Sequence, residues 1–302
     1  MEEFIRPLVP AIILFALVFV PLTVVVGTVL LLKRQEAREA RRSPLTDKLL
    51  HQAGAQARKR VDEISESIME RLMQVMLIGP MVMLVILLPR VTWSKLHFSW
   101  LTWLAVAGAG LWIIWLTRQV VLLRRERKRW RQGMLAEIAV AQQLDRLMAQ
   151  QCYVMHDIPA KDFNIDHVVV GASAVFMVET KSRRKSGAGK ASAIVVYDGK
   201  TLQFPTWSES KPLQQTRDNA RWLAAYLRGE TGESTVVIPV LCLPGWYVQL
   251  TKDSHHGDVR VINPKMTSLF VEAGSRPRLD TAHRNRIVNA LYKRYPDLDV
   301  AE

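Results

Sequence analysis

Two apolar, β-branched runs separated by a short turn constrain the fold of this chain more than any other feature. The first run is Asn164–Gly171 and the second is Ala174–Lys181, and only Ala172 and Ser173 lie between them. Apolar runs that flank a turn of small residues are typical of two paired antiparallel strands. The sequence therefore predicts a hairpin of two paired strands.

Each run carries an acidic residue where a buried strand should have none. With a two-residue turn, Asp166 lies directly opposite Glu179, with the two Cβ atoms roughly 5 Å apart. Lys181 lies on the same side as Glu179, about 7 Å further along the strand, and Thr180 points to the other side. A three-residue turn would instead place Asp166 opposite Val178 and separate the two acids.

This layout of two acids and a lysine suits metal-dependent cleavage of phosphodiesters. Two facing carboxylates offer the oxygen ligands that a hard cation such as Mg²⁺ prefers. A bound cation polarises the scissile phosphate and lowers the pKa of a bound water, and the Lys181 ammonium can position that water. The alternative is a surface salt bridge between Glu179 and Lys181. The opposing Asp166 favours a site, because two facing carboxylates destabilise a sheet unless something neutralises them.

The chain has 302 residues and a net charge of +13, with an isoelectric point near 10.0. That balance favours anionic partners, either nucleic acid or the anionic face of a membrane. The two cysteines, Cys152 and Cys242, are far apart and lie in apolar runs. We therefore expect buried free thiols in a reducing compartment.

Three apolar stretches predict an α-helical membrane region within residues 1–123. The spans are expected at about 8–32, 72–88 and 100–117, joined by a cytoplasmic helical segment at 33–71. Positive residues follow the first and third stretches, so the positive-inside rule places the N-terminus outside and everything beyond Arg118 inside. This topology predicts a multi-pass protein of the inner membrane with its remaining domain in the cytoplasm.

Residues 124–302 have the mixed pattern of an α/β domain, with a mixed sheet flanked by helices. Helices are expected at about 125–150, 210–228 and 281–295. The expected strands are Cys152–Ile158, Ile165–Gly171, Val175–Lys181, Ala193–Tyr197, Thr201–Phe204, Thr235–Leu243 and Val259–Ile262. In the first helix the apolar stripe, extended backwards, reaches Glu137, which places a carboxylate on the face toward the sheet. His156-Asp157, at the end of a strand, is interpreted as structural.

Four short motifs in this domain resemble the nuclease-related domain called NERD, over residues 130–250. They are Glu137 on the first helix, Ile165-Asp166, Glu179-Thr180-Lys181, and Pro212-x-x-Gln215, where Lys211 replaces the family's asparagine. The resemblance implies a restriction-endonuclease-like fold of the PD-(D/E)xK superfamily and a Mg²⁺-dependent role in DNA processing.

The helix that carries Gln215 has a stripe of amides and aromatics. Gln215, Asn219, Trp222 and Tyr226 follow helical spacing and share a face, which could contact nucleotides or could simply be half-buried. For Gln215 we favour a functional role, and for Asn219 a contact with nucleic acid. Basic residues after the second strand, namely Arg183, Arg184, Lys185 and Lys190, are expected to hold phosphates, with a solvated basic loop as the alternative.

The resulting hypothesis is a membrane-anchored, metal-dependent nuclease that cleaves DNA. Asp166, Glu179 and the Thr180 carbonyl would bind Mg²⁺, with Mn²⁺ as a substitute, and Lys181 would orient the attacking water. Glu137 would hold a metal-bound water or a second ion, and Gln215 would position the phosphate. The expected partners are DNA, the lipid bilayer and a further copy of the chain, and a role against foreign DNA would follow from the topology. The alternative is a catalytically silent module with the same fold, either one that binds nucleic acid or a membrane-tethered regulatory one.

Overall fold

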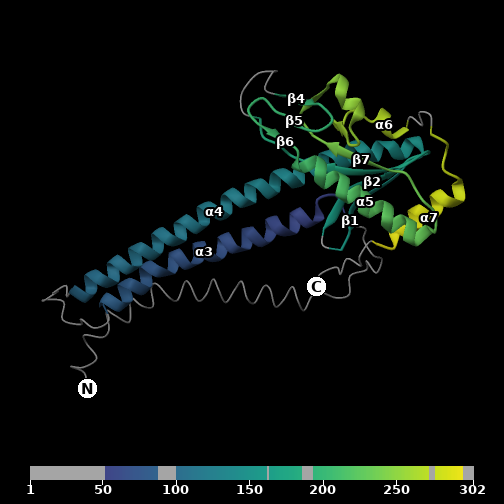
Figure 1. Cartoon of the computed structure of the whole chain (residues 1–302). Helices are drawn as coiled ribbons and strands as arrows, with labels where there is room; N and C mark the ends of the chain where they lie inside the picture. The colour runs from purple at the N-terminus through teal and green to yellow at the C-terminus, as the bar shows by residue number, and fades with distance from the viewer. Residues whose placement is uncertain (1–51, 88–99, 162, 186–192, 272–275, 295–302) are drawn as a thin grey trace, which may run out of the picture. The chain divides into compact units, whose positions relative to one another are not determined.

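The computed structural model describes residues 52–87, 100–161, 163–185, 193–271 and 276–294 (Figure 1). The chain divides into two compact units. Of the described residues, 62–87 and 100–128 belong to the first unit, and 52–61 together with 129–294 belong to the second.

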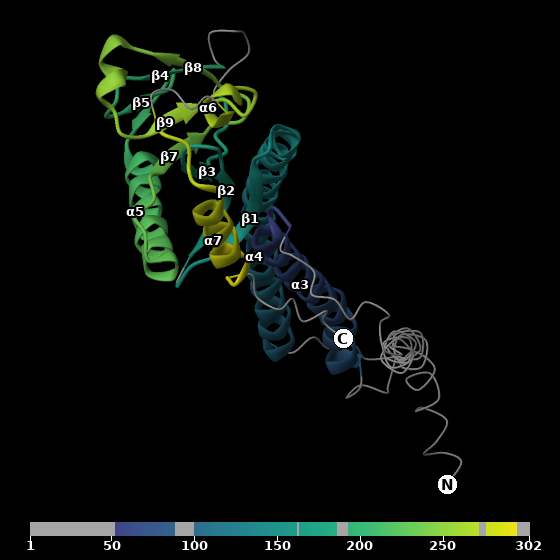
Figure 2. The ribbon, with the colours of Figure 1, turned by 90° about the vertical axis from the view of Figure 1, so that its right-hand side faces the viewer.

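The first unit consists of the larger parts of two long helices, α3 (Ala55–Leu87) and α4 (Trp100–Leu144). The two helices run side by side in both ribbon views (Figures 1 and 2). Ile64 and Ile68 of α3 form an apolar cluster with Val120 of α4, and the Arg71 guanidinium lies 5.7 Å from the ring centre of Trp115. Helix α4 is continuous through the position where the sequence predicted a boundary between a membrane span and a separate helix.

None of the helices in the described ranges is apolar enough over a sufficient length to cross a membrane. The predicted span at 8–32 lies outside the described residues. The spans predicted at 72–88 and 100–117 fall largely in α3 and α4, where this finding gives them no support.

A mixed five-stranded sheet forms the centre of the second unit. Its strands are β1 (Tyr153–Pro159), β2 (Asn164–Val170), β3 (Val175–Thr180), β7 (Val237–Cys242) and β9 (Arg260–Ile262), in the spatial order β1-β2-β3-β7-β9. Strands β1, β2 and β3 are antiparallel, whereas β3, β7 and β9 are parallel. The predicted hairpin is therefore the pair β2–β3, at the centre of this sheet.

The hairpin has the two-residue turn on which the predicted site depends. The Gly171 N–H donates to the Ala174 carbonyl at 3.0 Å, and the register pairs Val170 with Val175 and His167 with Val178. Extended by one residue, this register brings Asp166 opposite Glu179. The turn is fixed by close packing, because a Cβ atom at Gly171 would lie 2.9 Å from a carbonyl oxygen of Phe270.

A second, four-stranded sheet corrects the prediction of one central sheet. It contains β4 (Ile194–Tyr197), β5 (Leu202–Gln203), β6 (Ser208–Glu209) and β8 (Tyr247–Leu250), in the order β6-β5-β4-β8. The sequence did not reveal this sheet because β4 pairs in parallel with β8, a strand that the pattern did not predict. Its core is aromatic, with Phe204 stacked on Trp207 and edge-on to the buried Trp246.

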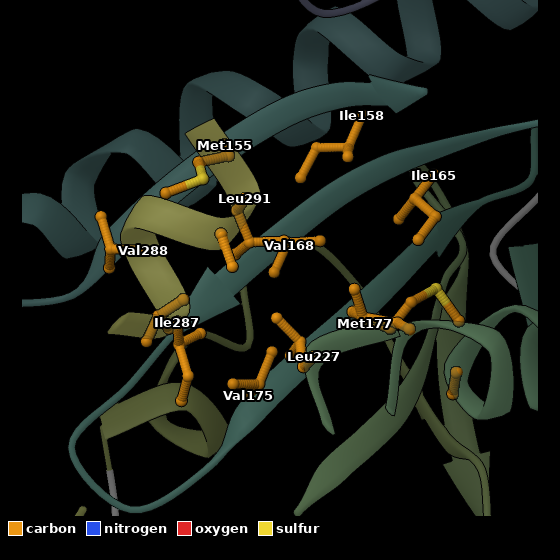
Figure 3. Packing of buried hydrophobic residues seen from close by; sticks show 14 residues of the cluster. Met155, Ile158, Ile165, Val168, Val175, Met177, Leu227, Ile287, Val288 and Leu291 are labelled. Carbon is orange, nitrogen blue, oxygen red and sulfur yellow. The ribbon is translucent and has the colours of Figure 1, made fainter. Parts of the chain in front are cut away.

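Two helices cover one face of the five-stranded sheet, α5 (Lys211–Thr231) and α7 (Thr281–Tyr292). Both confirm the predicted helices, although α5 is longer and α7 ends earlier. Figure 3 shows the labelled side chains of the strands and of α7 and α5 pointing toward one another in this core. The short elements η3 (Lys252–His256) and α6 (Ser268–Val271) lie in the connections near β9.

The other face of the sheet packs against the end of α4 and the 3₁₀ turn η1 (Asp145–Gln150). Val140, Leu144 and Leu147 contact strand residues such as Phe176 and Val178 in this second core. The predicted helix at 125–150 is therefore correct in place, but its last six residues are 3₁₀. Both cysteines are buried and free, as expected. Because α4 and α5 lie on opposite faces, the end of β3 is reached by side chains from both helices.

Candidate active site

Glu179 is the centre of the site, and protein donors hold both of its carboxylate oxygens. Lys181 Nζ lies 2.6 Å from Oε1, and Gln215 Nε2 donates to the same oxygen at 2.9 Å. Asn219 Nδ2 donates to Oε2 at 3.0 Å. Gln215 and Asn219 are one turn apart on α5, and therefore both amides reach the end of β3. The Glu179 side chain is buried, so these donors offset the cost of removing a charge from water.

Three residues on the predicted amide–aromatic stripe have roles different from nucleotide contact. Asn219 was predicted to bind nucleic acid, but it is buried and donates to Glu179. Trp222 and Tyr226 stack on each other with ring centres 5.5 Å apart, and Arg294 lies over both rings. The Tyr226 hydroxyl donates to the Ala290 carbonyl of α7 at 2.7 Å. For these two aromatics the half-buried helix face is the correct alternative.

Asp166 is the third residue of β2, and the backbone of β3 holds its carboxyl group. The Thr180 N–H donates to Asp166 Oδ2 at 2.7 Å. Burial is the largest cause that raises the pKa of Asp166 well above its usual range, and the carboxylates of Glu179 and Glu137 add to the effect. The Thr180 N–H and the Lys181 ammonium act in the opposite direction without overcoming it. The surrounding protein groups therefore favour the protonated form of the Asp166 carboxyl group.

Glu137 reaches the same cluster from α4. Burial, followed by the charges of Asp157 and Glu179, raises the pKa of Glu137 from 4.5 to about 7, while Lys181 lowers it. Sequence periodicity predicted that this acid would face the sheet, and its electrostatic coupling to the acids of the sheet agrees with that prediction.

Asp157 is a further carboxylate at the site, and the sequence interpretation gave it only a structural role. It is buried, its backbone φ is +50°, and its Oδ1 accepts a hydrogen bond from Asn164 Nδ2 at 2.7 Å. A positive φ is uncommon for an aspartate in a strand. The only sequence signal was an acid near the end of an apolar strand, the same signal that singled out Asp166.

A partly buried chain of hydrogen bonds links Asp145 of η1 to β1, β2 and β3. His156 lies 2.9 Å from Asp145 Oδ1 through Nε2, and its Nδ1 lies 2.9 Å from Nδ1 of His167. His167 Nε2 in turn lies 3.2 Å from the Thr180 hydroxyl. Burial and the neighbouring His156 lower the pKa of His167 well below its usual range, so His167 is neutral.

The acceptor at one end of this chain determines the direction of its hydrogen bonds. Asp145 accepts, so His156 carries a proton on Nε2 and, when neutral, accepts on Nδ1. His167 must then donate from Nδ1 and accept on Nε2, and the Thr180 hydroxyl donates to it. With this arrangement every group in the chain has a partner, and the chain fixes the Thr180 side chain.

A cleft of about 410 Å³ opens beside these acids. Helix α4 contributes Arg129, Gln132, Gly133 and Glu137 to its lining, and the end of β3 with the following segment contributes residues 180–184. Glu137 and Lys181 thus line an open space, whereas Glu179 and Asn219 lie behind it, in the protein interior. The cleft is large enough to admit a phosphate group.

The predicted phosphate-binding residues have different surroundings. Arg183 forms a two-point ion pair with Glu209, from Nε at 2.7 Å and from an amino group at 3.0 Å. Arg184 donates from Nε to the neutral Gln132 at 2.7 Å and is exposed, as is Lys185. Lys190 lies outside the described residues.

The donor set is compatible with a divalent cation, but it does not form a ready-made cage. The described residues include no group of three or more His, Cys, Asp or Glu side chains arranged to hold a metal ion. The predicted ligands were two carboxylates, Asp166 and Glu179, and the carbonyl oxygen of Thr180. The raised pKa of Asp166 indicates that a nearby cation would be stabilising at this position.

Residues 132–244 match the family model described as the nuclease-related domain, NERD. The match begins in α4, ends after β7, and includes Glu137, Asp166, Glu179, Lys181 and Gln215. Comparisons with curated proteins and with solved structures gave no significant match.

Proposed function

Because residues 132–244 match the nuclease-related domain, we propose that the chain is a metal-dependent nuclease that cleaves DNA. The observation that carries the proposal is the meeting of Asp166, Glu179, Glu137 and Lys181 at one end of β3, beside an open cleft. Carboxylates and an ammonium group at the mouth of a cleft are suited to a phosphodiester and an attacking water.

Each residue has a role that follows from its surroundings. Lys181 Nζ is held at Glu179 Oε1, at the edge of the cleft, where it can orient a water molecule and stabilise charge on the phosphate oxygens. Glu137, with a pKa of about 7, can hold a proton or release it near neutral pH. Gln215 and Asn219 fix the carboxylate of Glu179. Attack by water would add oxygen to phosphorus and release one ester oxygen as the leaving group.

Asp166, Glu179 and the Thr180 carbonyl would hold Mg²⁺, or Mn²⁺ in its place. When bound, the ion would polarise the phosphate and lower the pKa of a coordinated water. The chain's own contribution is to keep Asp166 in position through the Thr180 N–H and to keep Glu179 oriented through the two amides of α5.

The membrane anchor is a separate part of this proposal. It rests on the 25 uncharged residues from Leu8 to Leu32 and on the arginines and lysine that follow them. With this orientation the nuclease domain would lie in the cytoplasm at the inner membrane and would meet DNA that enters the cell.

One observation favours a second function, a catalytically silent module that binds nucleic acid. Lys181, Gln215 and Asn219 already satisfy both oxygens of Glu179. Two of these donors share Oε1 and one takes Oε2, so of the roughly four lone-pair sites of the carboxylate only one, on Oε2, is left for a cation.

The test is cleavage of DNA by the purified 302-residue chain with Mg²⁺, with Mn²⁺ and with chelator. The nuclease predicts cleavage that requires the ion and that is lost in both Lys181→Ala and Asp166→Asn. If wild-type and Lys181→Ala protein show the same background while salt-sensitive binding of DNA persists, the silent module is correct.

A further inference from the structure

The cleft beside the candidate active site has a basic wall that the catalytic roles above do not use. Arg129 and Arg184 line it from two segments, α4 and the chain after β3. We propose that these two arginines hold a DNA backbone phosphate next to the scissile one, and that Gly133 provides the space for it. This inference rests on the proposed function, because it assigns a subsite of the same substrate.

The first argument is the availability of charge. Arg129 and Arg184 are exposed, and neither forms an ion pair with another residue in the described part of the chain. Arg184 uses Nε to donate to Gln132, a neutral partner, and therefore retains its full charge and the donors of its two amino groups. A guanidinium with two free amino groups can bind a phosphate through two parallel hydrogen bonds.

The guanidinium of the neighbouring Arg183, in contrast, is already paired within the protein. Its Nε and one amino group donate to Glu209, and its other amino group donates to the Ser182 carbonyl. Its charge is balanced within the protein, so it contributes less to an anion in the cleft. Of these two adjacent arginines, the structure assigns the phosphate to Arg184 and a structural role to Arg183.

Gln132 holds in place the segment after β3 that carries Arg184. Its Nε2 donates to the Ser182 hydroxyl at 2.8 Å, and its Oε1 accepts from Arg184 at 2.7 Å. One amide therefore attaches two residues of the segment after β3 to α4. Because Arg129 is three residues before Gln132 on the same helix, both arginines lie along one side of this attachment.

Gly133 supplies an independent observation. A glycine inside a helix costs about 1 kcal/mol relative to alanine, so a structural reason is expected for its presence in the middle of α4. Packing is not that reason, because a Cβ atom at Gly133 would meet no atom within 4 Å. Gly133 lines the cleft, and its missing side chain leaves room between the two arginines and Glu137.

The experiment measures the affinity of the 302-residue chain for a short fluorescent DNA duplex, with chelator present, over a series of salt concentrations. Arg184→Ala and Arg129→Ala should each weaken binding several-fold and reduce the slope of log Kd against log salt by about 1, as expected for one lost phosphate contact. Lys265→Ala, which removes an exposed charge outside the cleft, is the charge-matched control and should leave Kd unchanged.

A second pair of variants tests the space itself. Gly133→Glu and Gly133→Gln add side chains of nearly equal size, and the thermal midpoint of both should equal or exceed that of the wild type, because no atom opposes a Cβ there and both residues favour a helix more than glycine does. The negative charge should weaken DNA binding well beyond the effect of the neutral amide. Equal affinity of both variants and the wild type would overturn the proposal.

The outcomes separate this subsite from the nuclease function. Weakened binding in the arginine variants without any cleavage by the wild type supports the subsite and rejects the nuclease. Metal-dependent cleavage with unchanged Kd in all cleft variants rejects the subsite and leaves the nuclease intact. If the same variants lose binding to vesicles of anionic phospholipid but not to DNA, the arginines serve a membrane surface and the proposal is wrong.

Discussion

The side-chain amide of Asn219 donates to Glu179 Oε2 at 3.0 Å, although the two residues are 40 positions apart in the chain. This contact joins the middle of α5 to the end of β3 and positions the acid that lies at the centre of the site. Asn219 is buried, so its amide has no access to bulk water as a substitute partner.

Asn219→Leu should therefore destabilise the protein by about 1–3 kcal/mol, because it leaves a buried carboxylate oxygen without its donor. The measurement is the free energy of unfolding from urea denaturation. Gln214→Ala, on the exposed side of the same helix where Gln214 contacts Asp218, is the control and should change stability by less than about 0.5 kcal/mol. Equal effects of the two substitutions would show that the contact with Glu179 is not stabilising.

Lys181→Met should reduce the rate of DNA cleavage by roughly 100-fold or more, because it removes the ammonium group at the edge of the cleft. Single-turnover cleavage at saturating Mg²⁺ measures this effect. Lys265→Met provides a control outside the cleft. A variant that keeps the wild-type rate constant would remove Lys181 from the reaction.

The stability of the protein should fall as pH rises through the range set by Glu137. Its pKa is 4.5 when unperturbed and about 7 in the folded state, so the folded protein binds the proton more tightly. The contribution of Glu137 to the free energy of unfolding is therefore largest below about pH 4.5, decreases between the two values, and is lower above pH 7 by at most about 3 kcal/mol.

Glu137→Gln should remove this decrease, since glutamine does not ionise. The thermal midpoint of the variant should exceed that of the wild type at pH 8 and approach it near pH 5. A wild-type stability curve that runs parallel to that of Glu137→Gln over this range would contradict the raised pKa.

Mg²⁺ should stabilise the wild-type protein at pH 8 because a cation bound only to the folded state shifts the unfolding equilibrium. The carboxylates of Glu179 and Glu137 beside Asp166 are the charges that a bound cation would neutralise. The midpoint of thermal unfolding should rise with Mg²⁺ concentration in the wild type and should not change in Asp166→Asn. A shift of the same size in both proteins would place the ion elsewhere.

Thr180→Val should destabilise the protein by about 1–3 kcal/mol, because Nε2 of the buried His167 loses the donor that satisfies it. Thr180→Ser retains a hydroxyl and should recover most of the loss. Nitrogen NMR of the two histidines tests the direction of the chain: His167 should carry its proton on Nδ1 and His156 on Nε2. The opposite tautomers would reverse the assignment of Thr180 as the donor.

The residues that could be placed from the sequence are those whose position depends on local periodicity. The turn at Ala172-Ser173 set the register of β2 and β3, so the opposition of Asp166 and Glu179 followed from counting along two strands. The helical stripe of α4 likewise pointed to Glu137. The second sheet was not predicted, because its pairing of β4 with β8 joins segments about 50 residues apart that no local pattern links.

By itself, the sequence determined the period of each strand and helix and therefore which acids share an edge of the sheet. Only the tertiary structure decided which side chains meet those acids. It directed Asn219 to Glu179 rather than to solvent, paired Arg183 with Glu209 while leaving Arg184 beside a neutral amide, and brought Asp157 into the cluster. The reason is physical: backbone periodicity acts over a few residues, whereas the partner of a buried charge is selected by whichever elements the core packs together.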